Sequence, residues 1–235
     1  MVAPEGYQVY YSVPHLEGQM VVAKRYVLEP GEAIIGYPVI IDAIIETVQI
    51  AIVGTLGAVL ISMPFALLAA RNISPHPIVY MITRVFLNVN RSIPTLIWAL
   101  IMVSAVGLGP FAGIMALFVA SIGSTARLYA ESFEQIDPNQ VAAVRATGAG
   151  PLQVFNFGVL PQAFPLLATY SLISFEGNVR ESTILGIVGA GGVGFVIQKY
   201  TALFQFNRLM GAVIIIAIMV TIIDRVSDTI RKRII

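Results

Sequence analysis

The chain has 235 residues and a formal net charge of +1, with 57% hydrophobic and only 11% charged residues. Because an ordinary soluble domain carries about 25% charged residues, this composition excludes a soluble globular protein and indicates an integral membrane protein. The sequence contains no cysteine, which excludes disulfides and thiolate metal sites. Apart from the cluster Arg231–Arg233, the basic residues are scattered, which argues against a nucleic-acid partner.

The apolar residues come in runs of helical length without strict alternation, so we expect an all-α polytopic membrane protein rather than a β-barrel. Residues 1–38 are interrupted by prolines and glycines and contain no apolar run typical of a signal peptide. We expect them to form an extracytoplasmic or interfacial segment ahead of one membrane domain at residues 39–235.

Uncharged segments predict about five spanning helices, since the hydrocarbon core is ~30 Å thick and a helix rises ~1.5 Å per residue. The C-terminal cluster Arg231–Arg233 predicts a cytoplasmic C-terminus, and counting back places residues 135–158 in the cytoplasm as well. The expected spans are Thr47–Ala70, Ile78–Val106, Phe111–Tyr129, Val159–Phe175 with a charged continuation toward Ile184, and Leu209–Ile223.

A moderately polar stretch at residues 142–161 lies between these apolar runs and is the best candidate for a surface that meets a soluble partner. Asp137 and Pro138 favour a helix start, because Asp is a preferred N-cap and Pro suits the first turn. We expect a short rigid helix at 139–148 that Gly148 caps and Gly150-Pro151 ends. The alternative is an ordinary interfacial helix-turn-helix between two spans.

The same stretch resembles the cytoplasmic motif of permease subunits of prokaryotic ABC importers, which reads Glu-Ala-Ala, three residues, Gly, nine residues, Ile, one residue, Leu-Pro. Gly148 and Leu160-Pro161 match at that spacing, whereas Ala142 stands at the Glu position and Gly158 at the Ile position. The segments that resemble, more specifically, the permease subunit of phosphonate ABC importers are 106–113, 145–149, 158–162, 175–180 and 188–194.

This resemblance implies the transmembrane domain of a type I ABC importer in a prokaryotic plasma (inner) membrane. The implied partners are a second, identical permease copy, a cytoplasmic ABC ATPase dimer, and an extracytoplasmic binding protein that delivers phosphonate, phosphate or a related oxyanion. ATP and Mg would be held by the ATPase, because this chain has no phosphate-binding Gly-x-x-x-x-Gly-Lys-Ser/Thr loop; no catalytic residue, cofactor or metal is expected here. The residues expected to couple the permease to the ATPase are Ala142, Ala143, Arg145, Gly148, Leu160 and Pro161.

Polar side chains within the second span suggest a passage for the substrate. An ionisable group at the centre of a span costs about 2.5–3.5 kcal/mol on insertion scales, so such groups usually face a cavity or one another. Arg84, Asn88 and Arg91 follow a helical spacing that Thr95 continues, and this face predicts a passage wall that attracts an anion. In the alternative, Arg84 lies near the cytoplasmic headgroups and Arg91 pairs with a carboxylate.

The far half of the fourth span is also charged. Glu176 and Arg180 lie at i,i+4 and are expected to neutralise each other, while Asn178 and Glu181 lie on another face. One hypothesis is that Arg180 or Asn178 contacts the passing oxyanion. The other is a purely structural ion-pair network, since Glu176 beside the path would repel a phosphonate.

A glycine-rich segment follows the fourth span. Gly189, Gly191, Gly192 and Gly194 fit the letters of the dinucleotide fingerprint Gly-x-Gly-x-x-Gly, but the strand-helix-strand context that this fingerprint needs is missing. So many neighbouring glycines cannot form a stable helix interior. We expect a flexible extracytoplasmic turn that contacts the binding protein or gates the outer mouth.

Other functions fit parts of the sequence. An ABC permease for another small solute, such as an amino acid or methionine, would share the Gly-rich turn and the Leu-Pro ending. An ion-gradient-driven secondary transporter fits the composition. A membrane enzyme acting on lipid would use Glu176 and Glu181 as acid and base, but no nucleophile or metal triad accompanies them. His15 and His76 lie in loops beside prolines, where structural roles are commoner than ligation.

Overall fold

The computed structural model describes residues 13–14, 20–21 and 39–234 of the chain, which divides into the units Met1–Ile41 and Asp42–Ile235. In the first unit, β1 (Val13–Pro14) pairs antiparallel with β2 (Met20–Val21). The expectation that residues 1–38 form an extracytoplasmic or interfacial segment otherwise lies outside the described residues.

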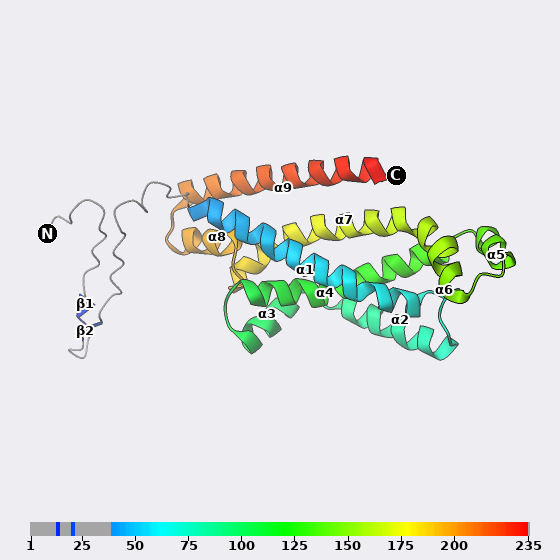
Figure 1. The fold of residues 1–235 in the computed structure, drawn as a ribbon. Helices are drawn as coiled ribbons and strands as arrows, with labels where there is room; N and C mark the ends of the chain where they lie inside the picture. The colour runs from blue at the N-terminus through cyan, green and yellow to red at the C-terminus, as the bar shows by residue number, and fades with distance from the viewer. Residues whose placement is uncertain (1–12, 15–19, 22–38, 235) are drawn as a thin grey trace. The chain divides into compact units, whose positions relative to one another are not determined.

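From Val39 onward the described chain is helical (Figure 1). Four helical segments are long and apolar enough to cross a membrane, and the bent pair α2–α3 makes a fifth if it forms one span. The predicted all-α polytopic fold with about five spans is confirmed. The helices are α1 (Val39–Ala69), α2 (Pro77–Ser92), α3 (Thr95–Val106), α4 (Pro110–Glu134), α5 (Pro138–Ala146), α6 (Pro151–Val154), α7 (Leu160–Leu185), α8 (Val193–Ala202) and α9 (Phe206–Ile234), with a π-helical turn η2 (Phe155–Val159) before α7 and a 3-10 turn η3 (Gly186–Val188) after it.

The prediction of one helix across Ile78–Val106 is wrong, because α2 and α3 meet at an angle of 85°. Pro94 has no N–H with which to continue the helical hydrogen bonds, and Ile93 before it is extended, with φ −89° and ψ 118°. Thr95 therefore begins a new helix, and the continuous polar face predicted from Arg84 to Thr95 is interrupted at this break.

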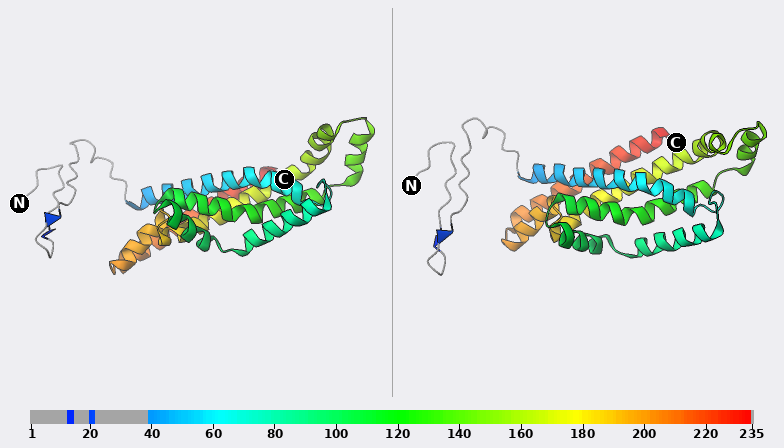
Figure 2. Two further views of the ribbon diagram at one scale, coloured as in Figure 1. Left: turned by 90° about the horizontal axis from the view of Figure 1, so that it is seen from below. Right: turned by 60° about the horizontal axis from the view of Figure 1, so that its bottom comes forward.

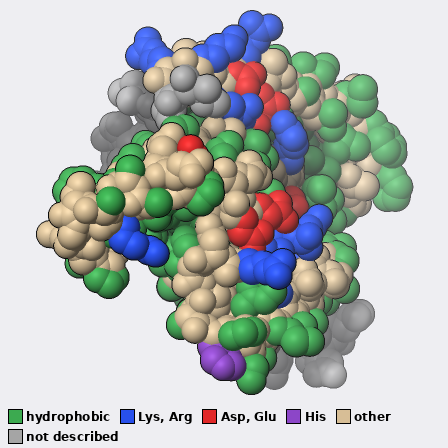
Figure 3. All heavy atoms as spheres, turned by 90° about the vertical axis from the view of Figure 1, so that its right-hand side faces the viewer, with side chains coloured by type: hydrophobic (Ala, Val, Ile, Leu, Met, Phe, Trp, Pro, Cys, Tyr) green, Lys and Arg blue, Asp and Glu red, His purple; other side chains and the backbone are tan. Residues whose placement is uncertain are grey.

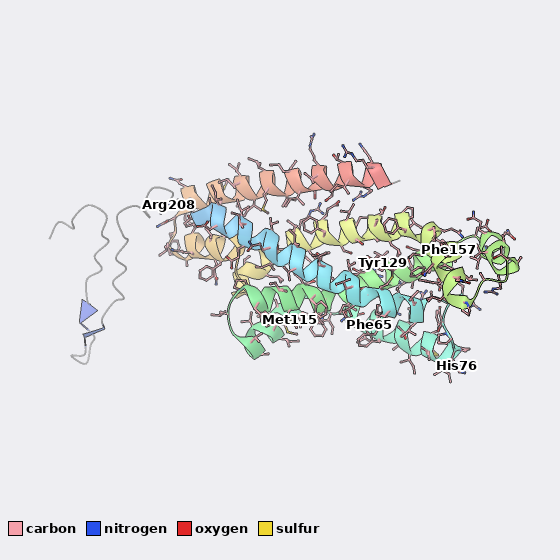
Figure 4. The ribbon with its side chains drawn as sticks, viewed as in Figure 1. Phe65, His76, Met115, Tyr129, Phe157 and Arg208 are labelled. Carbon is pink, nitrogen blue, oxygen red and sulfur yellow. The ribbon has the colours of Figure 1, made fainter. Side chains whose placement is uncertain are left out.

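Helix α4 lies at the centre of the second unit and packs against α2, α3 and α7. Small residues on α4 let the neighbouring backbones approach closely. A Cβ atom on Gly123 would lie 2.9 Å from the Leu87 carbonyl oxygen, so a side chain has no room where α2 crosses α4. Farther along α4, the Tyr129 hydroxyl is hydrogen-bonded to Ser171 of α7 (Figure 4).

One end of the second unit carries α5 and α6, which lie beyond the ends of its long helices (Figures 1 and 2). His76 also lies toward this end and caps α2, because its Nδ1 accepts a hydrogen bond of 3.2 Å from the Ile78 N–H (Figure 4). Helix α9 packs beside α7 and runs toward the same end, so its C-terminal basic residues approach it. A view onto this end shows acidic and basic side chains gathered between apolar surfaces (Figure 3).

Candidate functional site

Helix α5 is a short exposed element whose two ends are fixed by local hydrogen bonds. The Asp137 carboxylate accepts a 2.8 Å bond from the Asn139 N–H, and Pro138 occupies the first turn. At the other end, Gly148 has a φ of +82° and donates its N–H to the Arg145 carbonyl. None of the residues of α5 is buried in the described chain. The helix and caps predicted here are confirmed, and the element is free to contact a partner.

The helix α5 ends at Ala146, before Gly150-Pro151, as the sequence predicts. Pro151 then begins a new helix, α6, with Gly150 as the N-cap and the Gln153 side chain accepting a 2.9 Å bond from the Gly150 N–H. The helix then continues through η2 into α7, so Leu160 and Pro161 lie within a single long helical segment. The Leu160 N–H bonds to the carbonyl five residues back, at Phe155, just before the proline that has no N–H.

Two contacts hold α5 on the start of α7. A Cβ atom on Gly158 would lie 3.5 Å from both Val141 and Val144, so a large side chain there would push α5 away. The Gln162 side chain accepts a 2.9 Å bond from the Asp137 N–H and donates a 2.6 Å bond to the Gly158 carbonyl. Sequence reasoning missed Gln162, although a polar residue directly after Leu160-Pro161 was an available signal.

A groove of about 920 Å³ opens between α5 and the α6–η2 segment. Ala142 and Arg145 line one wall, and both side chains are exposed. The structure thus brings these two predicted coupling residues into one groove, while Ala143 lies exposed on α5 outside it and Gly148 closes the helix. Leu160 and Pro161 do not line this groove; they are the first two residues of α7.

The predicted polar face of the second span divides into paired and unpaired residues. Arg84 forms an ion pair of 2.8 Å with Glu134 and donates to the Ala69 carbonyl. The same Glu134 oxygen accepts the Arg71 N–H at 2.8 Å, so this cluster fastens the turn between α1 and α2. Asn88 accepts a 3.0 Å bond from Arg127, which also pairs with Glu131 on α4.

Arg91 differs from Arg84, since it has neither an ion pair nor a side-chain hydrogen bond within the described residues. It lines a cavity of about 420 Å³ at the α2–α3 break, together with Thr95 of α3, Ser124 of α4 and Glu181 of α7. Thr95 thus lies in the same cavity as Arg91, although the helix that was expected to join them is broken.

The prediction that Glu176 and Arg180 neutralise each other is wrong. Glu176 pairs with Arg231 and Arg180 pairs with Asp224, each at 2.7 Å. Helix α9 lies along α7 and offers ionic partners that are closer than the neighbour one turn away. Both residues therefore hold α9 against α7.

Asn178 joins three helices. It is only 4% exposed, and its oxygen accepts a 2.9 Å bond from the Ser121 hydroxyl of α4. Its amide nitrogen donates a 2.8 Å bond to the Thr55 hydroxyl of α1. With both ends of the amide engaged, Asn178 has no exposed face for a solute in this structure and serves to pack α1, α4 and α7.

The glycine-rich segment is packed against its neighbours, so the prediction that it is flexible is wrong, while its predicted extracytoplasmic location and its role at the outer mouth or in contact with the binding protein stay predictions. A Cβ atom on Gly192 would overlap the Thr47 hydroxyl of α1, and the same hydroxyl accepts a 2.8 Å bond from the Val193 N–H. The Gly189 carbonyl accepts a 2.9 Å hydrogen bond from the Gly109 N–H, and this bond connects the segment to the α3–α4 turn. Gly191 lies against Glu46, and Gly194 already belongs to α8, a helix that the sequence did not predict.

Within the part of the chain that the structure describes, no group of three or more His, Asp or Glu residues could hold a metal ion. The candidate sites are therefore a protruding helix at one end, a cavity lined by charged residues at the α2–α3 break, and the ion pairs that join the spans.

Together these features define a polytopic helical membrane protein with an exposed short helix at one end of its long helices. The chain belongs to the family described as "Binding-protein-dependent transport system inner membrane component", whose model matches residues 62–235. It is thus the inner membrane component of a transport system of that family.

Two relatives show how far the similarity extends. A phosphite transport system permease protein of Stutzerimonas stutzeri is 41% identical over 197 residues, which cover 84% of this chain and 72% of that protein. A phosphate-import permease protein of Mycolicibacterium smegmatis is 45% identical over 190 residues, which cover 81% of this chain and 36% of that longer protein.

The fold resembles a permease chain in an inward-facing structure of the MetNI methionine ABC transporter. The TM-score is 0.75 at 25% identity, and the match covers 83% of this chain and 96% of that one. The fold expected for a type I ABC importer permease is therefore confirmed.

Proposed function

We propose that this chain is the membrane-spanning subunit of an ATP-driven importer of phosphate, phosphite, a phosphonate or a related oxyanion. The observation that carries the proposal is the 41% identity to a phosphite permease over 84% of this chain and 72% of that relative. A second, identical permease copy and an extracytoplasmic binding protein complete the membrane assembly. A cytoplasmic ATPase dimer holds ATP and Mg, and both α5 and the C-terminus face the cytoplasm.

In this proposal α5 is the contact with the ATPase. Its exposure supports docking, and Arg145 supplies the polar contact, because Ala142 has no carboxylate to offer at the position where the family motif has Glu. A movement of α5 reaches α7 through Gln162 of α7, which accepts a bond from the Asp137 N–H at the start of α5.

Helix α7 then transmits the movement to the other spans as a rigid-body shift. Asn178 joins α7 to α1 and α4, and the pairs Glu176–Arg231 and Arg180–Asp224 join it to α9. The spans that line a central passage therefore move together when the ATPase subunits close and open.

The test is reconstitution of the permease with its ATPase and binding protein in proteoliposomes. We expect ATP-dependent uptake of radiolabelled phosphate or phosphite that methylphosphonate inhibits and methionine does not. Uptake that only methionine inhibits would assign another cargo to the same architecture. Uptake that needs an ion gradient and no ATP, or a permease that purifies without an ATPase, would refute the proposal.

A further inference from the structure

We propose that the cavity at the α2–α3 break is a binding site, within the membrane, for an oxyanion that still carries a proton. Arg91 would bind its negative oxygens and Glu181 would accept a hydrogen bond from its P–OH group. This inference rests on the proposed function, because it assigns the passing oxyanion to a particular place in the permease. The cavity has a volume of about 420 Å³, which accommodates a small oxyanion and several waters at about 30 Å³ each.

Both charged residues lie close to the ends of their own helices but near the level of the middle of α4. The Asn90 side chain accepts a 3.1 Å bond from the Gly123 N–H, which places the neighbouring Arg91 level with the middle of α4. The bond from Ser121 of α4 to Asn178 of α7 places Asn178 at a similar level. Glu181 follows Asn178 within one turn of α7. If α4 spans a bilayer centred on its middle, this region lies within the hydrocarbon core.

At that depth each charge needs a partner or a water-filled cavity, since an isolated one costs about 2.5–3.5 kcal/mol on insertion scales. Arg84, Glu176 and Arg180 all have partners within 4.0 Å. Within the described residues, neither Arg91 nor Glu181 has an ion pair or a side-chain hydrogen bond, and yet both line one cavity. The missing interactions are the ones that a protonated oxyanion supplies.

The break at Pro94 adds a second source of positive potential. It starts α3 inside the cavity wall, with Thr95 and Leu96 as the first helical residues. The first backbone N–H groups of a helix lack intrahelical acceptors and favour a nearby anion. The planar guanidinium of Arg91 has paired N–H groups that match two oxygens of a phosphate. These groups and the N–H groups at the start of α3 would donate hydrogen bonds to the negatively charged oxygens of the ligand.

Glu181 then determines which oxyanions are accepted. An ionised carboxylate repels a fully deprotonated anion, but it accepts a hydrogen bond from a P–OH group. Hydrogen phosphate, hydrogen phosphite and singly ionised phosphonates carry such a group, whereas sulfate carries none at neutral pH. The rest of the wall is largely apolar and includes Ala120, Ile184 and Leu185, so it offers no competing acceptors at those positions.

The chain contains no cysteine, so a single introduced thiol reports on the cavity. Ala120→Cys places the thiol in the wall, and Leu203→Cys places one on the exposed α8–α9 turn as the matched control. Both are made in the full permease–ATPase complex, and labelling of the permease by N-ethylmaleimide is followed by mass spectrometry. We expect inorganic phosphate to slow labelling at position 120 at least tenfold, sulfate to have no effect there, and neither anion to affect position 203.

Variants of the two charged residues test the assignment. Arg91→Met should abolish protection by phosphate, and Arg91→Lys, which keeps the charge but not the paired donors, should weaken it. Glu181→Gln should let sulfate protect as well as phosphate, because an amide can donate to a deprotonated anion. A merely structural Glu181 would not change the choice between the two anions.

The outcomes separate this inference from the proposed function. If the Ala120→Cys complex imports phosphate while phosphate leaves labelling at position 120 unchanged, the binding site is refuted and the proposed function stands. If phosphate protects position 120 but the complex imports no oxyanion, the proposed function falls and the site stands. Equal protection by sulfate and phosphate in the parent complex would refute the role of Glu181.

Discussion

Replacing Gln162 by leucine should uncouple ATP hydrolysis from transport. Leucine has a similar volume, but it loses the hydrogen bond that joins the N-cap of α5 to α7, and also the bond to the Gly158 carbonyl that holds the Gln162 side chain in position for it. The remaining contact between α5 and this region is the packing of Val141 and Val144 against Gly158. Apolar packing is non-directional, so α5 could then rotate or slide without moving α7.

The magnitude follows from the two bonds. Each intramolecular hydrogen bond contributes about 0.5–1.5 kcal/mol net, and the bond from the exposed Asp137 N–H lies at the low end because water replaces Gln162 there. A loss of about 1–2 kcal/mol changes an equilibrium by a factor of about 5–30. We therefore expect the amount of oxyanion imported per ATP hydrolysed to fall about 5–30-fold.

The assay measures uptake and ATP hydrolysis together in proteoliposomes that contain the complete complex. Gln153→Leu is the matched control, because it also removes one hydrogen bond within this loop, to the Gly150 N–H, but that bond does not connect α5 to α7. The reasoning is refuted if Gln162→Leu imports at the parental ratio, or if both variants lose coupling equally.

Three further substitutions test the structural assignments. Gly148→Ala should weaken assembly of the complex with the ATPase, because a left-handed conformation costs a non-glycine residue about 1–2 kcal/mol. The control Gly177→Ala, inside α7 with open space around it, should assemble normally. Equal assembly of the two variants would contradict this role of the Gly148 cap. Gly192→Ala should lower the thermal unfolding midpoint of the detergent-solubilised protein, because the new Cβ overlaps the Thr47 hydroxyl and because Gly192 has a positive φ. An unchanged midpoint would show that this segment is loosely packed. Asn178→Leu should destabilise the protein by about 1–3 kcal/mol in chemical unfolding, since it leaves the buried Ser121 hydroxyl of α4 without its acceptor and removes the donor to Thr55 of α1, which keeps only its bond to the Ala51 carbonyl. Parental stability would refute the role of Asn178 in joining the three helices.

The sequence by itself determined the parts of this protein that depend on local chemistry and composition. Hydropathy located the spans, because a lipid-embedded backbone must be helical and its length must match the bilayer. Asp137, Pro138 and Gly148 predict α5 from the sequence alone, since capping depends on residues a few positions apart. The spacing of Gly148 and Leu160-Pro161 indicated the family for the same local reason.

Only the tertiary structure decided which polar groups meet. Arg180 bonds to a residue 44 positions away and Glu176 to one 55 positions away, so a rule based on i,i+4 spacing chose the wrong partners. The sequence predicted one helix through Pro94, and only the packing of α2, α3 and α7 on α4 showed the break there and brought Arg91 and Glu181 into one cavity. Interactions between distant helices depend on that packing, which no local pattern along the chain records.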